Sequence, residues 1–248
     1  MLDTKGNKIS YFGHSAFGLT TGAGAVALID PWLTNPLCPK ELPEPKRVDA
    51  IFLSHAHGDH MGNTVALAKK HKCTVVCMVE TAAWLTSKGI GEQVKEMNKG
   101  GSFTAGEFGV TLTHAFHSNS IEDGDQVIYA GEPAGLIVRM PGGFTIYHAG
   151  DTAVFGDMQL IAEIYRPDVA MLPIGDNYTM GPREAAYAVK LLGVGHVIPM
   201  HYATFPVLTG TVEAFKKECA EIAGPVTVHG MRPGESLGGE HSAGARGD

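Results

Sequence analysis

Short runs of almost wholly apolar residues recur along the chain, and several of them stop at a histidine or an aspartate. The run at 50–53 leads directly into SHAHGDH, and later runs lead into His117, Asp151 and His201. Apolar runs of this length are typical of strands that are covered on both faces, and helical patterns lie between many of them. A chain with this alternation must place helices against its sheets, which predicts an α/β protein.

The order of the predicted elements narrows the architecture. A meander of hairpins opens the chain, and strands alternating with helices follow. The predicted strands cover 8–13, 16–21, 25–30, 50–54, 74–79, 109–116, 134–140, 144–150, 169–175, 196–201 and 226–230. The predicted helices cover 63–71, 157–165, 183–193 and 211–224. This order predicts two sheets packed face to face with helices outside, in one domain over residues 1–237, and a disordered tail over 238–248.

Composition excludes several classes of partner. The formal net charge is -7 and no long Lys/Arg run occurs, so nucleic acid and anionic membranes are not the expected partners. No signal peptide pattern opens the chain, and no apolar run approaches the roughly 20 residues that span a bilayer. The four cysteines are too few for a disulfide framework, and we interpret Cys73 and Cys77, which share one face of a predicted strand, as core residues. The expected location is the cytoplasm, and the expected partner is a small-molecule substrate.

Three histidines and an aspartate fall within six consecutive positions, 55–60. In an extended segment His55 and His57 point to the same side. Gly58 turns the chain without steric cost, which lets Asp59 and His60 face back toward the same space. Imidazole and carboxylate suit Zn²⁺, Mn²⁺ or Fe²⁺, and the absence of a thiolate argues against a structural Cys-rich zinc site. The cluster therefore predicts a metal site.

The remaining ligands of such a site are expected at the ends of other strands. Candidates are His114 and His117 in LTHAFHS, His148 and Asp151 in YHAGDT, and His201 in VIPMHYATFP. Each follows an apolar strand where the chain enters a loop. In an open α/β sheet these loops gather at one edge and form the active crevice, so we expect the candidates to converge there.

Taken together, these motifs resemble those of the metallo-β-lactamase superfamily of metal-dependent hydrolases. The resemblance rests on HAHGDH, AFHS, HAGDT, PIGDNYTMGP, PMHYATFP, GHSAF and IDPWL, which together cover about residues 9–236. The nearest likeness is to small predicted hydrolases related to the L-ascorbate-6-phosphate lactonases. The resemblance implies a four-layer αββα sandwich. Those lactonases assemble into oligomers, so the resemblance allows a homo-oligomer, but the sequence leaves the oligomeric state open.

Carried over residue by residue, the resemblance implies two metal sites that share a bridging carboxylate. The first site is His55, His57 and His117, the second is Asp59, His60 and His201, and the bridge is Asp151. His114 and His148 do not match the superfamily's ligands and are interpreted as neighbours of the site. The superfamily's oxygen-reducing di-iron proteins usually carry Glu at the second histidine of the cluster, so His57 argues against that branch.

Four further residues each allow two interpretations. Asp30 precedes a proline and either buttresses a ligating imidazole or forms a turn. His14 in GHSAF either contacts substrate or serves a turn. Asp176 either positions substrate or ligands or starts the next helix, and Trp32 is either a pocket wall or a loop anchor.

The function that follows is metal-dependent hydrolysis. Two ions about 3.5 to 4 Å apart lower the pKa of a shared water from 15.7 to about 7. We expect a dinuclear hydrolase of a small ester, lactone or phosphoester, with Asp59 orienting the water as well as ligating. Zn²⁺ is the favoured metal, and Mn²⁺ or Fe²⁺ are the alternatives. The rival hypotheses are a non-catalytic metal-binding or regulatory protein that retains the fold, and a nucleic-acid-processing metallohydrolase.

Overall fold

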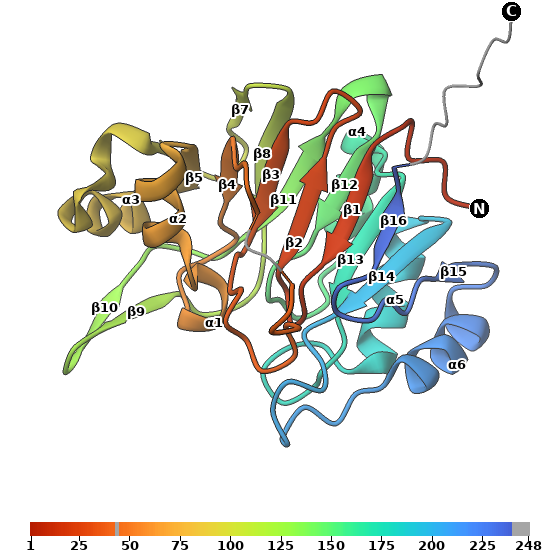
Figure 1. Ribbon diagram of the computed structural model, residues 1–248. Helices are drawn as coiled ribbons and strands as arrows, with labels where there is room; N and C mark the ends of the chain where they lie inside the picture. Colours follow the sequence, from red (N-terminus) through yellow and green to blue (C-terminus); the bar gives the residue numbers. More distant parts are fainter. Residues whose placement is uncertain (43–44, 240–248) are drawn as a thin grey trace, which may run out of the picture.

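Two seven-stranded sheets pack face to face in the computed structural model, which describes residues 1–42 and 45–239 (Figure 1). The first sheet is antiparallel over its first four strands and parallel over the rest. In spatial order its strands are β16 (Ser236–Gly238), β1 (Lys8–Tyr11), β2 (Phe17–Thr20), β3 (Val26–Ile29), β4 (Ala50–Phe52), β5 (Thr74–Met78) and β6 (Val94–Met97).

The second sheet has the same mixture of parallel and antiparallel pairing. Its strands from β7 to β12 pair antiparallel, and the others pair parallel. In spatial order they are β15 (Thr227–Val228), β14 (His196–Met200), β13 (Val169–Pro173), β12 (Thr145–His148), β11 (Ala134–Arg139), β8 (Phe108–His114) and β7 (Ser102–Ala105).

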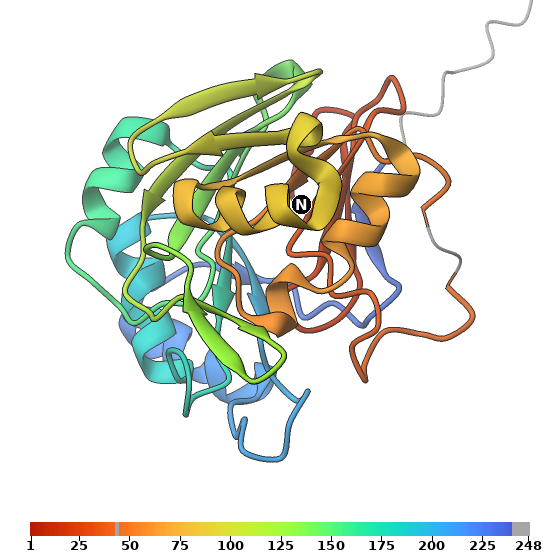
Figure 2. The same cartoon turned by 90° about the vertical axis from the view of Figure 1, so that its left-hand side faces the viewer.

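Helices lie on the outer faces of both sheets (Figures 1 and 2). On the first sheet they are α2 (Thr64–His71) and α3 (Val79–Leu85), and on the second they are α4 (Met158–Tyr165), α5 (Pro182–Leu192) and α6 (Val212–Ile222). The short α1 (Gly58–Met61) follows β4, and single turns of other helix types lie at Thr86–Ile90, Gly91–Gln93 and Pro141–Gly143. α5 begins with proline after Gly181 and ends at a left-handed Gly193, which are common start and stop residues.

Three buried clusters account for the four layers. The cluster between the sheets takes side chains from both, among them Phe52 of β4 and Leu136 of β11. A second cluster joins the outer face of the second sheet to α4, α5 and α6, and a third joins the first sheet to α2 and α3. Burial of these apolar surfaces is the main favourable term in folding. The αββα architecture predicted from the sequence is confirmed.

Several elements were not predicted. α3 begins at Val79, which the sequence analysis assigned to the preceding strand, and β6, β7 and β16 were missed. Gly238 lies in the segment predicted as a tail, but it belongs to β16 and pairs with Lys8, because residues 236–238 return to the edge of the first sheet. The rest of the predicted tail, 240–248, lies outside the described residues.

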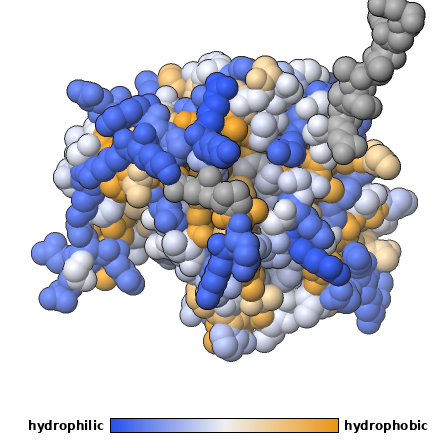
Figure 3. All heavy atoms as spheres, in the orientation of Figure 1, coloured by the Kyte–Doolittle hydropathy of each residue, from blue (hydrophilic) through white to orange (hydrophobic). Residues whose placement is uncertain are grey.

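A two-stranded hairpin, β9 (Ser120–Asp123) with β10 (Gln126–Tyr129), projects from the body of the fold beside α1 (Figures 1 and 2). Hydrophilic residues gather over α2, α3 and this hairpin in the view of Figure 3. Among the described residues no helix is both long and apolar enough to cross a membrane.

Candidate metal centre

The first group of candidate ligands consists of three imidazoles. His55 and His57 lie between β4 and α1, and His117 lies in the loop after β8. His55 Nε2 and His57 Nδ1 are 3.0 Å apart, and the ring of His117 is centred 5.2 Å from each of the other two rings. One nitrogen from each ring falls within 4.8 Å of the others. The spacing suits three ligands of one ion.

The second group surrounds the Asp59 carboxylate. Asp59 Oδ2 lies 3.7 Å from His201 Nε2 and 4.0 Å from His60 Nε2. The same oxygen, Asp59 Oδ2, lies within hydrogen-bond distance of His14 Nε2, at 3.0 Å. These four side chains form a second group whose ligand atoms lie within 4.8 Å of one another.

Asp151 stands between the two groups. One of its carboxylate oxygens is 3.0 Å from His201 Nε2 and 3.6 Å from His117 Nε2, and the other is 3.2 Å from His60 Nε2. The residue is buried and follows β12 directly. A carboxylate that contacts imidazoles of both groups has the position that a bridging ligand requires.

Asp30 lies behind the site, at the end of β3. Its Oδ2 accepts hydrogen bonds from His60 Nδ1 at 2.8 Å and Ser54 Oγ at 2.6 Å, and its Oδ1 accepts one from the Ser54 backbone at 2.8 Å. Ser54 Oγ is also 3.0 Å from His55 Nδ1. A buried carboxylate bonded to Nδ1 fixes the ring of His60 with Nε2 toward the site. Asp30 also has a left-handed φ of 44°, so it occupies a turn as well.

His14 comes closer to the candidate ligands than the sequence indicated. It is fully buried, its Nδ1 is 2.8 Å from Thr204 Oγ1, and its ring is centred 4.0 Å from that of His201. The His201 backbone donates to the His14 carbonyl at 2.9 Å, which joins the loop after β1 to the loop after β14. The sequence signal was only the GHSAF motif, and the contact with Asp59 depends on this pairing of distant loops.

Burial and neighbouring charges perturb the pKa values of the whole centre. Burial lowers the pKa of His55, His57 and His117, so these imidazoles are held neutral, the form that binds metal. Burial acts to raise the pKa of Asp151, but the imidazoles of His201 and His60 outweigh it and hold that pKa well below its usual range. These four side chains are therefore neutral or ionised as ligation requires.

Nearby carboxylates control the pKa values of two imidazoles in the second group. Burial acts to lower the pKa of His201, but the Asp151 carboxylate outweighs it and raises the pKa to about 9. The pKa of His60 rises for the same reason, because Asp151, Asp59 and Asp30 all face it. His14 is the exception, since burial lowers its pKa to about 4. The carboxylates therefore attract positive charge to the place where the imidazole nitrogens converge.

Two buried polar atoms support the fit of a metal ion. His60 Nε2 and Asp151 Oδ1 have no hydrogen-bond partner among the described residues, although they are 3.2 Å apart. Buried polar atoms are nearly always paired, and an unpaired one commonly marks an ion or water. Nitrogen and carboxylate oxygen are both ligands of Zn²⁺, Mn²⁺ and Fe²⁺. The residues present therefore fit the metal that the sequence predicted.

His114 and His148 lie apart from both groups. His114 is at the end of β8, where Lys99 Nζ approaches its Nδ1 at 3.3 Å. His148 is buried in β12, with Nε2 3.2 Å from the Ser15 carbonyl and Nδ1 accepting from the Gly150 backbone at 3.2 Å. Each ring thus has partners of its own.

Asp176 is exposed in the loop after β13 and accepts a hydrogen bond from the Asn177 backbone at 2.7 Å. Its left-handed φ of 67° places it in a tight turn. It does not line the hollow over the metal-binding groups. Tyr178, two residues later, lines it instead and was not predicted.

Two adjoining hollows of about 390 and 340 Å³ open onto the candidate ligands and share His57 and Asp59. Their other walls come from loops that are far apart in the sequence. These wall residues are Trp32, Ser118, Ser120, Glu122, Tyr178 and Phe205. Trp32 is therefore a pocket wall.

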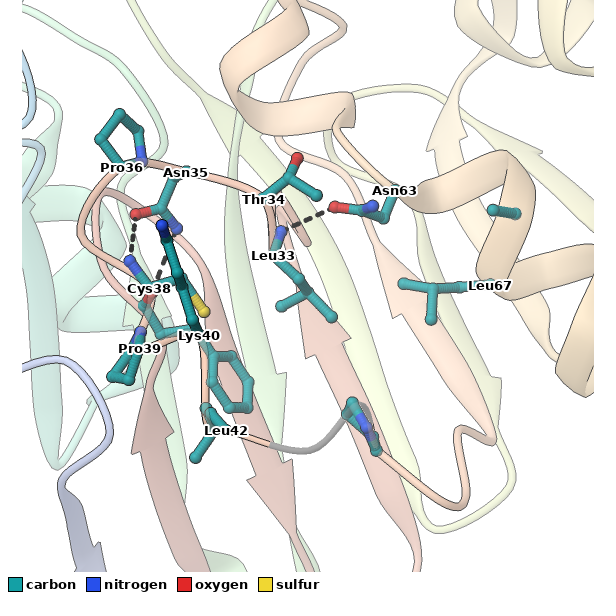
Figure 4. Close-up of a pocket in the computed structure, with 13 residues that line it drawn as sticks. Leu33, Thr34, Asn35, Pro36, Cys38, Pro39, Lys40, Leu42, Asn63 and Leu67 are labelled. Atoms are coloured by element: carbon teal, nitrogen blue, oxygen red, sulfur yellow. Dashed lines mark hydrogen bonds between the residues drawn. The ribbon is translucent and has the colours of Figure 1, made fainter.

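A separate cavity of about 560 Å³ lies between the loop after β3 and α2, with Leu33, Leu42 and Leu67 among its lining residues (Figure 4). None of the candidate ligands lines it. Across this cavity Asn63 Oδ1 accepts a hydrogen bond from the Leu33 backbone at 2.8 Å, which ties the loop to the start of α2. The cavity is a feature of the loop, not of the metal centre.

Comparison with known proteins identifies similar sequences over nearly the whole chain. The profile of the beta-lactamase superfamily domain matches residues 26–202. A UPF0173 metal-dependent hydrolase of Koribacter versatilis is 48% identical over 239 residues, covering 95% of this chain and 99% of the relative. Another from Rubrobacter xylanophilus is 48% identical over 235 residues, covering 94% and 97%.

A solved structure is similar as well. Igni18, a metallo hydrolase from the hyperthermophilic archaeon Ignicoccus hospitalis, superposes with a TM-score of 0.81 at 38% sequence identity. The match covers 93% of this chain and 97% of that one.

Proposed function

This chain belongs to the UPF0173 metal-dependent hydrolases of the metallo-β-lactamase superfamily, and we propose that it hydrolyses a small ester, lactone or phosphoester with two divalent ions. His55, His57 and His117 would hold the first ion, and Asp59, His60 and His201 would hold the second. Asp151 would be the ligand that the two sites share.

The position of Asp151 is the observation that carries the proposal of two ions. Its carboxylate contacts His117 of the first group at 3.6 Å and His201 of the second at 3.0 Å. A site for one ion would need this carboxylate in contact with only one of the two groups of imidazoles. The convergence of every predicted ligand also argues against a fold retained without metal binding.

The ions, when bound, would acidify a water and polarise the substrate oxygen. Asp59 would orient a water at this place, because 26% of its side chain is exposed whereas the other members of its group are buried. His14 holds Asp59 Oδ2 in place from behind, and Asp30 holds His60. No serine or cysteine nucleophile is needed.

The metal, the partner and the location form part of the same proposal. Zn²⁺ is favoured by the His-rich first group, and Mn²⁺ or Fe²⁺ suit the mixed His/Asp second group. A small-molecule substrate fits hollows of a few hundred Å³. All four cysteines are free thiols and three of them are buried, which suits a reducing cytoplasm.

Metal content and turnover together test the proposal. Protein purified without chelator should contain about two equivalents by elemental mass spectrometry, and Asp151→Ala should lower both the metal content and the hydrolysis of an ester, lactone and phosphoester panel. His114→Ala is the matched control for His117→Ala, because His114 ends β8, His117 lies three residues later, and only His117 is in the ligand groups. Less than about a tenth of an equivalent after addition of Zn²⁺ or Mn²⁺, or full turnover by Asp151→Ala, would refute the proposal.

A further inference from the structure

The hollows over the metal centre contain no basic wall. Among the described residues that line them, none is Lys or Arg, and the charged groups are the carboxylates of Asp59, Glu122 and Asp151 with imidazoles around them. Sites that bind phosphate usually supply Arg, Lys or a cluster of backbone N–H groups. We propose, resting on the hydrolase function above, that the substrate is an uncharged ester or lactone with an aromatic or bulky apolar group that packs against Trp32 and Phe205, and that phosphorylated substrates are disfavoured.

The charge balance of the loaded centre supports the exclusion of anions. Two divalent ions bring four positive charges, and the carboxylates of Asp30, Asp59, Asp151 and Glu122 match them one for one. Glu122 belongs to the β9–β10 hairpin and lines the hollow next to His57. A phosphate dianion therefore meets no surplus positive charge, and it approaches a carboxylate at the rim.

The aromatic wall is formed by two loops. Trp32 follows β3 and Phe205 follows β14, and their rings stack with centroids 6.0 Å apart and planes 27° apart. Both side chains are half-buried and line the same hollow, so each keeps a face open to it. Both rings also pack edge-on against His14, at 5.3 and 5.8 Å. An apolar group placed on this wall lies directly beside the second metal-binding group.

The position of Trp32 is fixed by the backbone around it. A Cβ on Gly62 would lie 2.4 Å from Trp32 Cα and 2.8 Å from the Pro31 carbonyl, so the loop packs directly onto the end of α1. The Asn63 backbone donates to that carbonyl at 2.9 Å, and the Asn63 side chain accepts from Leu33 (Figure 4). The wall is therefore formed before substrate binds, which lowers the entropy cost of binding.

Three esters that share one reacting centre separate the contributions of ring and charge. They are methyl acetate, methyl phenylacetate, and methyl phenylacetate with a phosphate on the para carbon. The phenyl group should raise kcat/KM about tenfold, the effect of removing about 60 Å² of apolar surface from water. The added phosphate should lower kcat/KM about fivefold or more, the effect of one unit charge about 4 Å from another in water.

Variants assign these effects to residues. Trp32→Ala should remove the preference for phenyl over methyl and Trp32→Phe should restore most of it. Glu122→Gln should raise the ratio of kcat/KM for the phosphorylated ester to kcat/KM for methyl phenylacetate about fivefold. Asp125→Asn is the matched control, because it removes the same charge from the same hairpin outside the hollows.

A binding measurement decides the inference independently of turnover. Isothermal titration of the metal-loaded protein with N-methyl-2-phenylacetamide and with its para-phosphorylated form should show tighter binding of the uncharged amide, and Trp32→Ala should weaken it about tenfold. Equal or tighter binding of the phosphorylated amide, or a higher kcat/KM for the phosphorylated ester, would overturn the inference but leave the dinuclear hydrolase standing. A protein that turns over no ester, lactone or phosphoester contradicts the proposed function, and the two amides still test the pocket.

Discussion

Asp30→Asn tests whether the buried carboxylate behind His60 holds the second metal-binding group in order. The wild-type carboxylate is fully buried and accepts three hydrogen bonds, two from Ser54 and one from His60 Nδ1. Asparagine has nearly the same shape but no charge, and one of its two polar atoms is a donor. If the asparagine oxygen accepts the hydrogen bond from the Ser54 backbone, its amide nitrogen faces His60 Nδ1. His60 Nδ1 must then lose its proton in order to accept a hydrogen bond from the amide.

The magnitude follows from those three bonds. Hydrogen bonds to a charged group contribute about 1.5 to 3 kcal/mol each and neutral ones about 0.5 to 1.5, so each of the three bonds loses about 1 to 1.5 kcal/mol and the metal-free variant should lose about 3 to 4.5 kcal/mol of stability. In a protein of this size that lowers Tm by roughly 6 to 18 °C. The forced tautomer also places the proton on His60 Nε2, which faces the site. Metal affinity should therefore fall about 10- to 100-fold.

Two assays on the same protein separate these effects. Competition with a chromophoric chelator gives the metal affinity, and thermal unfolding of the metal-free protein gives the stability. Asp49→Asn is the control, because Asp49 accepts a hydrogen bond from the Val26 backbone at 2.7 Å but lies in no ligand group. It should change stability and leave metal affinity unchanged. If Asp30→Asn binds metal as tightly as the wild type, Asp30 does not orient His60 for metal binding.

Three further predictions concern the scaffold and the metal. Gly62→Ala should lower the free energy of unfolding by about 2 to 3 kcal/mol, because the φ of Gly62 is +40° and the new Cβ meets the Trp32 backbone at 2.4 Å. The control Gly58→Ala, whose Cβ meets nothing within 4 Å, should lower it by under about 1 kcal/mol. Equal denaturant midpoints for the two variants would contradict this prediction. Thr211→Ala should cost about 1 kcal/mol, since the Thr211 side chain caps α6 by accepting from the Ala214 backbone at 3.1 Å, and its metal content should stay at the wild-type value. Chelation should lower Tm by about 8 to 16 °C if the free metal had been near 1,000 times its Kd, and an unchanged Tm would show that the folded state binds no ion.

Local pattern in the sequence was sufficient for the layers and for proposing most of the candidate ligands. Apolar runs bounded by helical patterns predicted the strands and the two-sheet architecture, because burial on both faces requires a continuous run. The alternation of His55 and His57 around one residue, and the start of α1 at Gly58, bring four candidate ligands together. His117, Asp151 and His201 could be proposed because each follows a strand, and strand ends meet at one edge. The choice of His117 over His114 and of Asp151 over His148 came from the family resemblance.

Tertiary structure alone decided the rest of the site. The contact of His14 with Asp59 depends on the backbone bond between His14 and His201, and those two residues are far apart in the sequence. Asp151 contacts both ligand groups because β12 lies beside β11 and β13 in one sheet. Neither relation leaves a local pattern.

The walls of the pocket were equally beyond the sequence. The projecting β9–β10 hairpin, with Glu122 at the rim, has no hydrophobic alternation strong enough to predict it, and α3 interrupts what reads as a strand. Trp32 is placed by the close approach of Gly62, and Phe205 by stacking on Trp32. The convergence of the candidate ligands could be predicted because regular elements fix where strand ends lie, whereas loop conformation is set by contacts between distant segments, which exist only once the chain has folded.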